Sequence, residues 1–336
     1  MFFYTNEDKR GKDDYANMSK KKAANGTVKI NKKPLGKRIW NNRGFYIMFL
    51  PVFIFLIITQ YWPMLGIRYA FYDYKPVGEP VFVGLKHFIK LFSAPPFWNS
   101  FFNTLELSIL KLIITTFASV VISILLNEMG NLCAKKFLQT VIYLPHFMSW
   151  VVTASIFSLF LSPSVTGMVN GILRDWGILE EGAKNIYFLG DSKWWTPVYY
   201  IINVWKETGW GTIIFLATLA GINPELYEAA DIDGASRFQK MRFVTLPALA
   251  NTIITVLILN LAKVMNLFES VFVLYNDAVR DVSDVVSTYI YRQTFGVALP
   301  NYGYSTAVGL FKSLVGCALV LICNYASKKV RGRGIV

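Results

Sequence analysis

The sequence predicts an all-α polytopic membrane protein with six transmembrane helices. Hydrophobic residues make up 54% of the chain, and the mean hydropathy is +0.40. Only 16% of the 336 residues are charged, whereas soluble domains carry roughly 25%. A chain this apolar, with long apolar runs separated by polar stretches, is expected to cross the membrane repeatedly rather than to carry a single anchor.

Six apolar runs define the predicted spans. Each is long enough to cross roughly 30 Å of hydrocarbon as a helix. The runs cover about 44–62, 99–126, 137–161, 195–221, 246–274 and 304–326. Pro145 should kink the third run, because proline removes a hydrogen bond inside a helix. The polar stretch 275–303 should hold a short helix over 282–295.

The distribution of positive charge predicts which side of the membrane each connection faces. Residues 1–43 hold 12 Lys or Arg and 4 Asp or Glu, so this polar tail is expected to be cytoplasmic and largely disordered, before a transmembrane domain over 44–336. The predicted inner segments together hold 21 Lys or Arg and the outer segments 9, so both termini should be cytoplasmic. The net charge of +13 therefore lies beside membrane lipid and does not indicate a nucleic-acid partner.

The loop 222–247 between the fourth and fifth spans carries ordered helix signals. Asn223 can cap a helix, and Pro224 suits the first helical position. Gly234 should end that helix, because glycine adopts the left-handed closing conformation at little cost. Ser236 can cap a second short helix. Thr245 with Pro247 repeats the start signal for a third helix, which is apolar.

The spacing in this loop resembles the EAA signature of permease subunits of ABC importers. The matching residues are Glu228-Ala229-Ala230, Gly234, Val244 and Leu246-Pro247, with Val244 where the family usually has Ile. The resemblance implies a coupling helix that docks on a cytoplasmic ATPase subunit. The implied coupling residues are Glu228, Ala229, Ala230, Asp233, Gly234, Ala235, Leu246 and Pro247. The alternative is an interfacial helix that has no partner.

Three further stretches are similar to the LplB-like branch of this family, which imports complex oligosaccharides. They are 83–88, 142–150 and 304–312. The resemblance implies the type I (MetI-like) importer permease fold in the bacterial plasma membrane. It also implies a second permease, two ATPase subunits that bind ATP and Mg²⁺, and an extracytoplasmic binding protein that delivers the oligosaccharide. Within the branch, importers of rhamnogalacturonan and alginate fragments are the nearest comparison.

The sequence offers no enzymatic or metal site. It contains no phosphate-binding loop of the GxxxxGK[ST] kind, so this chain is not expected to hydrolyse ATP itself. His87 and His146 are the only histidines, and neither has a nucleophile or a carboxylate pair nearby in sequence. The three cysteines have no metal-ligand spacing, and no cofactor is expected in this chain.

Polar and aromatic residues inside the predicted spans are candidates for a solute pathway. Charges in hydrocarbon are costly, so they usually face a cavity or a partner helix. Sugars stack on aromatic rings and form hydrogen bonds with polar groups, so an oligosaccharide path needs both kinds of side chain. The candidates are Trp150, Trp205, Lys206, Glu207, Trp210, Asn260, Lys263, Asn266, Ser270 and Lys312. In the fifth span, Asn260, Lys263 and Ser270 are expected to form a stripe on one helix face.

Less specific explanations stand beside each candidate. Lys206 could pair with a neighbouring helix, Lys312 could extend to the outer interface, and the tryptophans could fill space between helices. The three intramembrane lysines, Lys206, Lys263 and Lys312, suggest an acidic sugar as cargo. The rival functions are an ABC permease for peptide or phosphate and an ion-coupled secondary transporter, which would not need the EAA-like loop.

Overall fold

The computed structural model describes residues 35–164, 167–180 and 182–331, and it divides into two compact units. The first unit ends at Leu65 and the second begins at Gly66. Most of the predicted polar tail lies outside the described residues. Within that tail, α2 (Leu35–Asn41) is helical.

The described part of the first unit is helical. It contains α2, α3 (Arg43–Leu56), the π-helix η1 (Ile57–Tyr61) and α4 (Trp62–Met64). Helical structure extends from Arg43 to Phe71, which is long and apolar enough to cross a membrane. This agrees with the first predicted span. Pro51 lies within α3, which continues through it.

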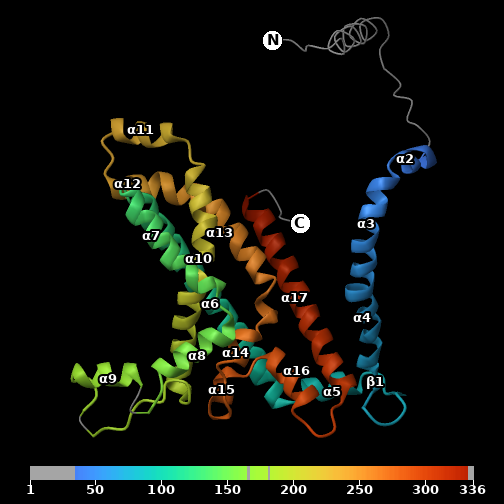
Figure 1. Cartoon of the computed structure of the whole chain (residues 1–336). Helices are drawn as coiled ribbons and strands as arrows, with labels where there is room; N and C mark the ends of the chain where they lie inside the picture. The colour runs from blue at the N-terminus through green and yellow to red at the C-terminus, as the bar shows by residue number, and fades with distance from the viewer. Residues whose placement is uncertain (1–34, 165–166, 181, 332–336) are drawn as a thin grey trace, which may run out of the picture. The chain divides into compact units, whose positions relative to one another are not determined.

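The 3₁₀ helix η2 (Leu65–Phe71) starts at the last residue of the first unit, and its remainder with a short antiparallel hairpin begins the second unit (Figure 1). The hairpin pairs β1 (Tyr72–Asp73) with β2 (Val81–Phe82). The remaining elements are α5 (Lys86–Phe92), α6 (Pro95–Glu128), α7 (Leu132–Tyr143), η3 (Leu144–Phe147), α8 (Trp150–Phe160), α9 (Met168–Asp175), α10 (Ser192–Ala220), α11 (Pro224–Ile232), α12 (Arg237–Lys240), η4 (Met241–Thr245), α13 (Leu246–Leu261), η5 (Val264–Asn266), α14 (Glu269–Phe272), η6 (Asp277–Val279), α15 (Arg280–Ser283), α16 (Val286–Phe295) and α17 (Tyr302–Arg331).

Helices α6 and α10 form the packed centre of this unit. Their contact depends on small residues, which let two helix backbones approach closely. A Cβ added at Gly211 of α10 would lie 2.4 Å from Ser119 Oγ of α6, and one at Gly209 would lie 2.3 Å from the carbonyl oxygen of Ile142 in α7. The Ser119 hydroxyl donates to the carbonyl oxygen of Thr208 at 3.0 Å. Glycine is therefore required at both positions for this packing.

The third predicted span is not one kinked helix. It is broken into α7 with η3 and then α8, and the two parts meet at 103°. Pro145 lies in η3, Met148 is extended, and Ser149 caps α8 by accepting from Val152 N–H at 3.2 Å. The position of the bend agrees with the prediction. The change of direction is larger than a kink, because the new N-cap at Ser149 starts a separate helix.

The fifth predicted span is also interrupted, which corrects the expected stripe on one helix face. Helix α13 ends at Leu261, the 3₁₀ helix η5 follows, and Leu267 is extended before α14. Asn260, Lys263 and Ser270 are therefore not spaced along a continuous helix. The backbone of Val264 helps to hold this break, because its carbonyl oxygen accepts from Ser108 Oγ of α6 at 2.8 Å.

The six-span count remains a prediction. Among the described residues, four helices are long and apolar enough to cross a membrane, or five if the bent pair counts as one span. Helix α10 has 29 residues but is not one of these, so it is too polar rather than too short. Its polar side chains Asn203, Lys206, Thr208 and Thr212 are buried, so they face the protein interior instead of lipid.

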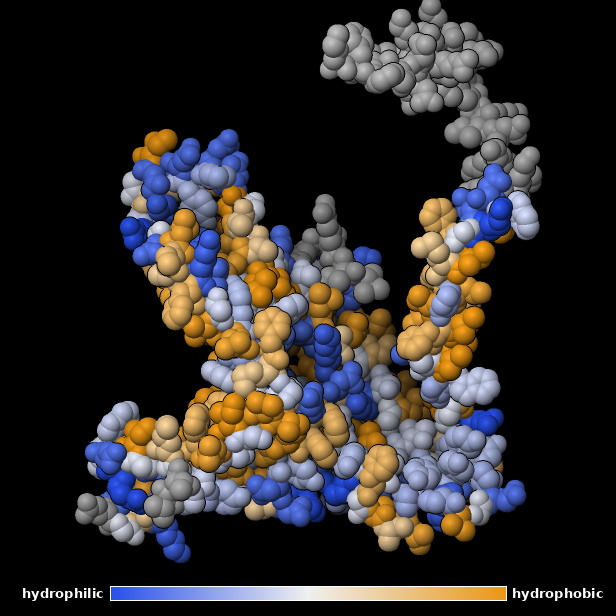
Figure 2. All heavy atoms as spheres, viewed as in Figure 1, coloured by the Kyte–Doolittle hydropathy of each residue, from blue (hydrophilic) through white to orange (hydrophobic). Residues whose placement is uncertain are grey.

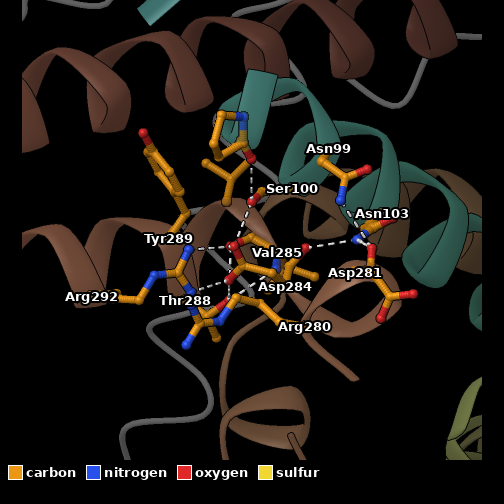
Figure 3. A network of polar contacts seen from close by, with 12 residues as sticks. Asn99, Ser100, Asn103, Arg280, Asp281, Asp284, Val285, Thr288, Tyr289 and Arg292 are labelled. Atoms are coloured by element: carbon orange, nitrogen blue, oxygen red, sulfur yellow. Dashed lines mark hydrogen bonds and ion pairs between the residues drawn. The ribbon is translucent and has the colours of Figure 1, made fainter. Parts of the chain in front are cut away.

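The connection between α14 and α17 is pinned to the start of α6 by a buried polar network (Figure 3). Arg292 of α16 donates twice to the Asp284 carboxylate, at 2.9 and 2.6 Å. Ser100 of α6 donates to the same carboxylate at 2.7 Å. The expected short helix over 282–295 is thus present as α16 from Val286, with α15 separate from it. The pairing with Asp284 raises the pKa of Arg292.

Candidate functional site

A cavity of about 800 Å³ lies between α6, η3, α8, α10 and the broken end of α13. Its depth follows from helix geometry. Lys111 lies halfway along the 34-residue α6, roughly 25 Å from each end. Glu207 lies near the middle of α10, roughly 20 Å from each end. The cavity therefore opens at mid-height of the central helix pair.

Seven of the ten predicted pathway residues line this cavity. These residues are far apart in the sequence. They meet at the cavity because the third and fifth spans are interrupted, so that η3 and the end of α13 both contribute to its lining. The seven are Trp150, Glu207, Trp210, Asn260, Lys263, Asn266 and Ser270. Trp205, Lys206 and Lys312 are not part of the lining, and a pathway role for these three stays a prediction.

Lys206 is an internal structural cation. Its side chain is only 3% exposed, and its ammonium group donates to the carbonyl oxygens of Pro145, His146 and Met148 at 3.4, 3.1 and 2.5 Å. The ammonium also lies 5.3 Å from the centre of the Trp150 ring. The Pro145 carbonyl oxygen also accepts from Met148 N–H at 3.2 Å. The break between η3 and α8 leaves the His146 and Met148 carbonyl groups without helical partners, and Lys206 supplies their donor.

The other two residues outside the lining, Lys312 and Trp205, also have local partners. Lys312 of α17 donates to Ser287 Oγ of α16 at 3.1 Å. Trp205 packs edge-on against Phe157 of α8, with ring centres 5.3 Å apart. The Trp205 contact matches the less specific explanation considered from the sequence, filling of interhelical space. For Lys312 that explanation was extension to the outer interface, whereas its ammonium group bonds to a neighbouring helix.

Sequence reasoning missed several residues of the lining. The most notable is Lys111, a charge in the second span that the intramembrane-charge argument could have included. The others are hydroxyl groups of α6, the histidine of the third-span break and an acidic residue of α14. These are Ser108, Thr115, Thr116, Ser119, His146 and Glu269. The α6 hydroxyls could not be singled out from the sequence. Serine and threonine in any helix can donate to a backbone carbonyl of the preceding turn, so their presence alone does not indicate a cavity.

One wall of the cavity combines aromatic and charged groups. His146 Nδ1 lies 3.4 Å from a carboxylate oxygen of Glu207. The same imidazole stacks on Trp210, with ring centres 5.1 Å apart and planes at 14°. Because Lys206 bonds to the His146 carbonyl, α10 contacts this residue through Lys206, Glu207 and Trp210, which lie within little more than one helical turn. The wall offers ring faces for sugar stacking and polar atoms for hydroxyl groups.

The predicted coupling loop has the expected local structure over its first two helices. Asn223 Oδ1 accepts from Glu225 N–H at 3.1 Å, and α11 follows from Pro224. Gly234 has φ +73°, the left-handed conformation predicted for it. Ser236 forms a full capping box with Gln239 at the start of α12.

The predicted third start signal in this loop is wrong. Helical structure continues without interruption from Arg237 to Leu261, through the π-helix η4. Thr245 does not cap α13, and its hydroxyl instead lies 3.0 Å from the Tyr227 hydroxyl of α11. Proline inside a helix normally removes a hydrogen bond and clashes with the preceding turn. Pro247 is tolerated here because it follows the π-helix η4, in which the backbone hydrogen bonds are shifted by one residue.

The outer face of the loop is exposed and partly apolar. Polar side chains gather over α11 and α12 (Figure 2). Ile232 is 87% exposed, and Leu226 and Phe238 are also exposed. Glu228, Ala229, Asp233, Gly234 and Pro247 are exposed, whereas Ala230, Ala235 and Leu246 are partly covered. In the described part of the chain, Glu228 has no ion pair. The loop is braced internally by Lys240, which pairs with Asp231 at 2.6 Å.

An all-α unit with a mid-height cavity and an exposed, braced helical loop defines the class of a membrane transport permease. The chain belongs to the family of binding-protein-dependent transport system inner membrane components, whose profile matches residues 30–332. It has the MetI-like permease fold of that family. It is therefore an integral membrane protein of a transport system, as the EAA-like loop predicted.

Two relatives from Bacillus subtilis (strain 168) are each 40% identical to this chain. One is the polygalacturonan/rhamnogalacturonan transport system permease protein YteP, with 91% of this chain and 94% of that protein covered. The other is the protein LplB, with 88% and 91% covered. A chain in the crystal structure of a bacterial ABC transporter for import of the acidic polysaccharide alginate is 36% identical, with a TM-score of 0.81 over 89% of this chain and all of that one.

Proposed function

We propose that this chain is a permease subunit of an ATP-driven importer for uronate-containing oligosaccharides. The observation that carries the proposal is the cavity, which joins stacking surfaces and charged groups at mid-height of the central helices. Two of the relatives are named for acidic polysaccharides, alginate and polygalacturonan. A solved relative was crystallised with a periplasmic protein that holds an alginate pentasaccharide, which supports delivery of the cargo by a binding protein.

The proposal divides the work among several subunits. A second, related permease completes the pathway, and two cytoplasmic ATPase subunits bind ATP and Mg²⁺. This chain itself contributes no ATPase site and sits in the bacterial plasma membrane with both termini in the cytoplasm, as its charge distribution favours. Glu228 and Ile232 are exposed on α11, which leaves this helix free to dock in a cleft of an ATPase subunit.

The connections of the loop supply a route from ATP hydrolysis to the cavity. Helix α11 follows directly on α10, and α12 is continuous with α13. Both α10 and α13 line the cavity, through residues such as Glu207 and Asn260. Because Lys240 and Tyr227 brace the loop internally, a displacement of α11 by the ATPase moves as a unit with the ends of these two helices. Their rotation switches the side on which the cavity opens.

Purification of the complex from membranes tests this function. Affinity capture of this chain is expected to bring down a second permease and an ATPase subunit. ATP hydrolysis by the captured complex in lipid should rise when a binding protein loaded with oligogalacturonate is added, and should not rise with the empty binding protein. Capture without any ATPase subunit would point to an ion-coupled transporter, and stimulation by a peptide or phosphate instead would reassign the cargo.

A further inference from the structure

We propose that Lys111 is the residue of this chain that recognises a carboxylate of the cargo, with Glu207 as its counter-ion in the empty cavity. The inference rests on the proposed function and deepens it. It replaces the expectation from sequence, in which Lys206, Lys263 and Lys312 favoured an acidic sugar. Two of those three ammonium groups are committed to protein oxygens outside the cavity.

Lys111 is placed to meet the cargo. It lies at the midpoint of α6, lines the cavity and is partly buried. Its ammonium group forms no hydrogen bond or ion pair with the described residues, in contrast to Lys206 and Lys312. A buried cation without a partner has a high desolvation cost. A carboxylate of the cargo that contacts the Lys111 ammonium would offset that cost, so the site should attract it.

Glu207 supplies the balancing charge from α10. Its carboxylate is near enough to attract the Lys111 ammonium without forming an ion pair. Nδ1 of His146 lies 3.4 Å from the same carboxylate. The His146 backbone is fixed in turn by Lys206. Glu207 thus lies near Lys111 without being bonded to it, and a cargo carboxylate can contact the ammonium without first breaking a short ion pair.

The complete set of charged groups around the cavity supports Lys111 over Lys263. The lining holds Lys111, Lys263, Glu207, Glu269 and the imidazole of His146. Lys263 and Glu269 both lie at the interrupted end of the fifth span and are exposed. Water therefore screens them, whereas the charge of Lys111 is less screened and acts more strongly on a bound carboxylate.

The test compares uptake of two cargoes by the full complex with its binding protein. The cargoes are trigalacturonate and the same trisaccharide with its carboxyl groups reduced to alcohols. For Lys111→Gln, uptake of trigalacturonate should fall about 10- to 100-fold, the loss expected for one hydrogen bond to a charged group, while uptake of the neutral trisaccharide changes less than about twofold. Lys111→Arg should retain most uptake of trigalacturonate. Lys312→Gln, an intramembrane lysine outside the cavity, should affect both cargoes by the same factor.

A second measurement removes the binding protein from the comparison. Equilibrium dialysis of trigalacturonate against the purified complex alone should show weak binding that is lost in Lys111→Gln and kept in Lys111→Arg. Equal loss of both cargoes in Lys111→Gln, or unchanged binding and uptake of trigalacturonate, would overturn the inference. Failure of the unmodified complex to take up either trisaccharide would instead count against the proposed function.

Discussion

At the scale of single residues, the structure separates intramembrane charges that hold the fold from those that face the cavity. The sequence identified Lys206 and Lys263 by the same argument, because both interrupt apolar runs. Their roles differ, since Lys206 is bonded to three carbonyl groups at a helix break and Lys263 lines the cavity. That distinction depends on where the third span breaks, which the sequence indicated only as a kink at Pro145.

Replacement of Lys206 by methionine should destabilise the permease. The change leaves the carbonyl oxygens of His146 and Met148 without their donor, at a cost of roughly 1–3 kcal/mol for each group that water cannot reach. Thermal unfolding of the purified complex measures the effect. Lys312→Met is the matched control, since it removes one bond to Ser287, and an equal fall in both midpoints would contradict the role of Lys206.

At the scale of elements, local signals were sufficient for the first two helices of the coupling loop and insufficient for its third start signal and for the interrupted spans. Asn223, Gly234 and Ser236 each act through their nearest neighbours, so their caps and turn were predicted correctly. The end of α13 at Leu261 has no proline or glycine signal and depends on a contact between Ser108 and the backbone of Val264. Thr245 misled the prediction because its hydroxyl has a tertiary partner, Tyr227.

Valine at position 234 should impair coupling without preventing membrane insertion. Gly234 has φ +73°, where a β-branched residue is strained by roughly 1–3 kcal/mol, so the turn between α11 and α12 should rearrange. We expect stimulated ATP hydrolysis to fall severalfold while the amount of inserted protein stays the same. Gly130→Val, in another loop with open space around it, serves as control. Normal stimulation in Gly234→Val would count against the loop as the coupling element.

The network around Asp284 fixes α16 to α6 and gives a second prediction at this scale. Arg292→Met removes both guanidinium bonds and leaves a carboxylate whose side chain is 5% exposed. Breaking a buried pair in this way costs about 3–5 kcal/mol. Proteolysis of the outer connection between α14 and α17 should therefore accelerate. The pairing raises the pKa of Arg292, so the ion pair stabilises the fold fully at any pH below the ordinary arginine pKa. Its contribution to the free energy of unfolding should therefore be constant between pH 5 and pH 9.

At the scale of the whole molecule, composition and the EAA-like loop predicted the family correctly, whereas the cavity required the structure. The 40% identity to YteP and LplB and the match over residues 30–332 agree with the resemblance seen in the loop. The cavity could not be drawn from sequence, because its lining comes from helices far apart in the chain and from two interrupted spans.

The orientation of the chain can be tested by labelling. In a chain whose three cysteines are replaced by alanine, Ile232→Cys should react with a membrane-impermeant maleimide in inside-out vesicles and not in intact cells. The position is well exposed in the isolated loop, and the chain should be expressed without ATPase subunits to keep it accessible. Val77→Cys, between the two hairpin strands, should show the opposite pattern. Labelling of Ile232→Cys from outside would place the loop beyond the reach of any ATPase.

Uptake into sealed vesicles tests the central claim most directly. Vesicles that contain the complete complex are given loaded binding protein and labelled trigalacturonate on the side facing the periplasm, with ATP on the other side. The account predicts accumulation of the sugar with ATP and no accumulation with a non-hydrolysable analogue. Accumulation without ATP hydrolysis, driven by an ion gradient alone, would contradict it.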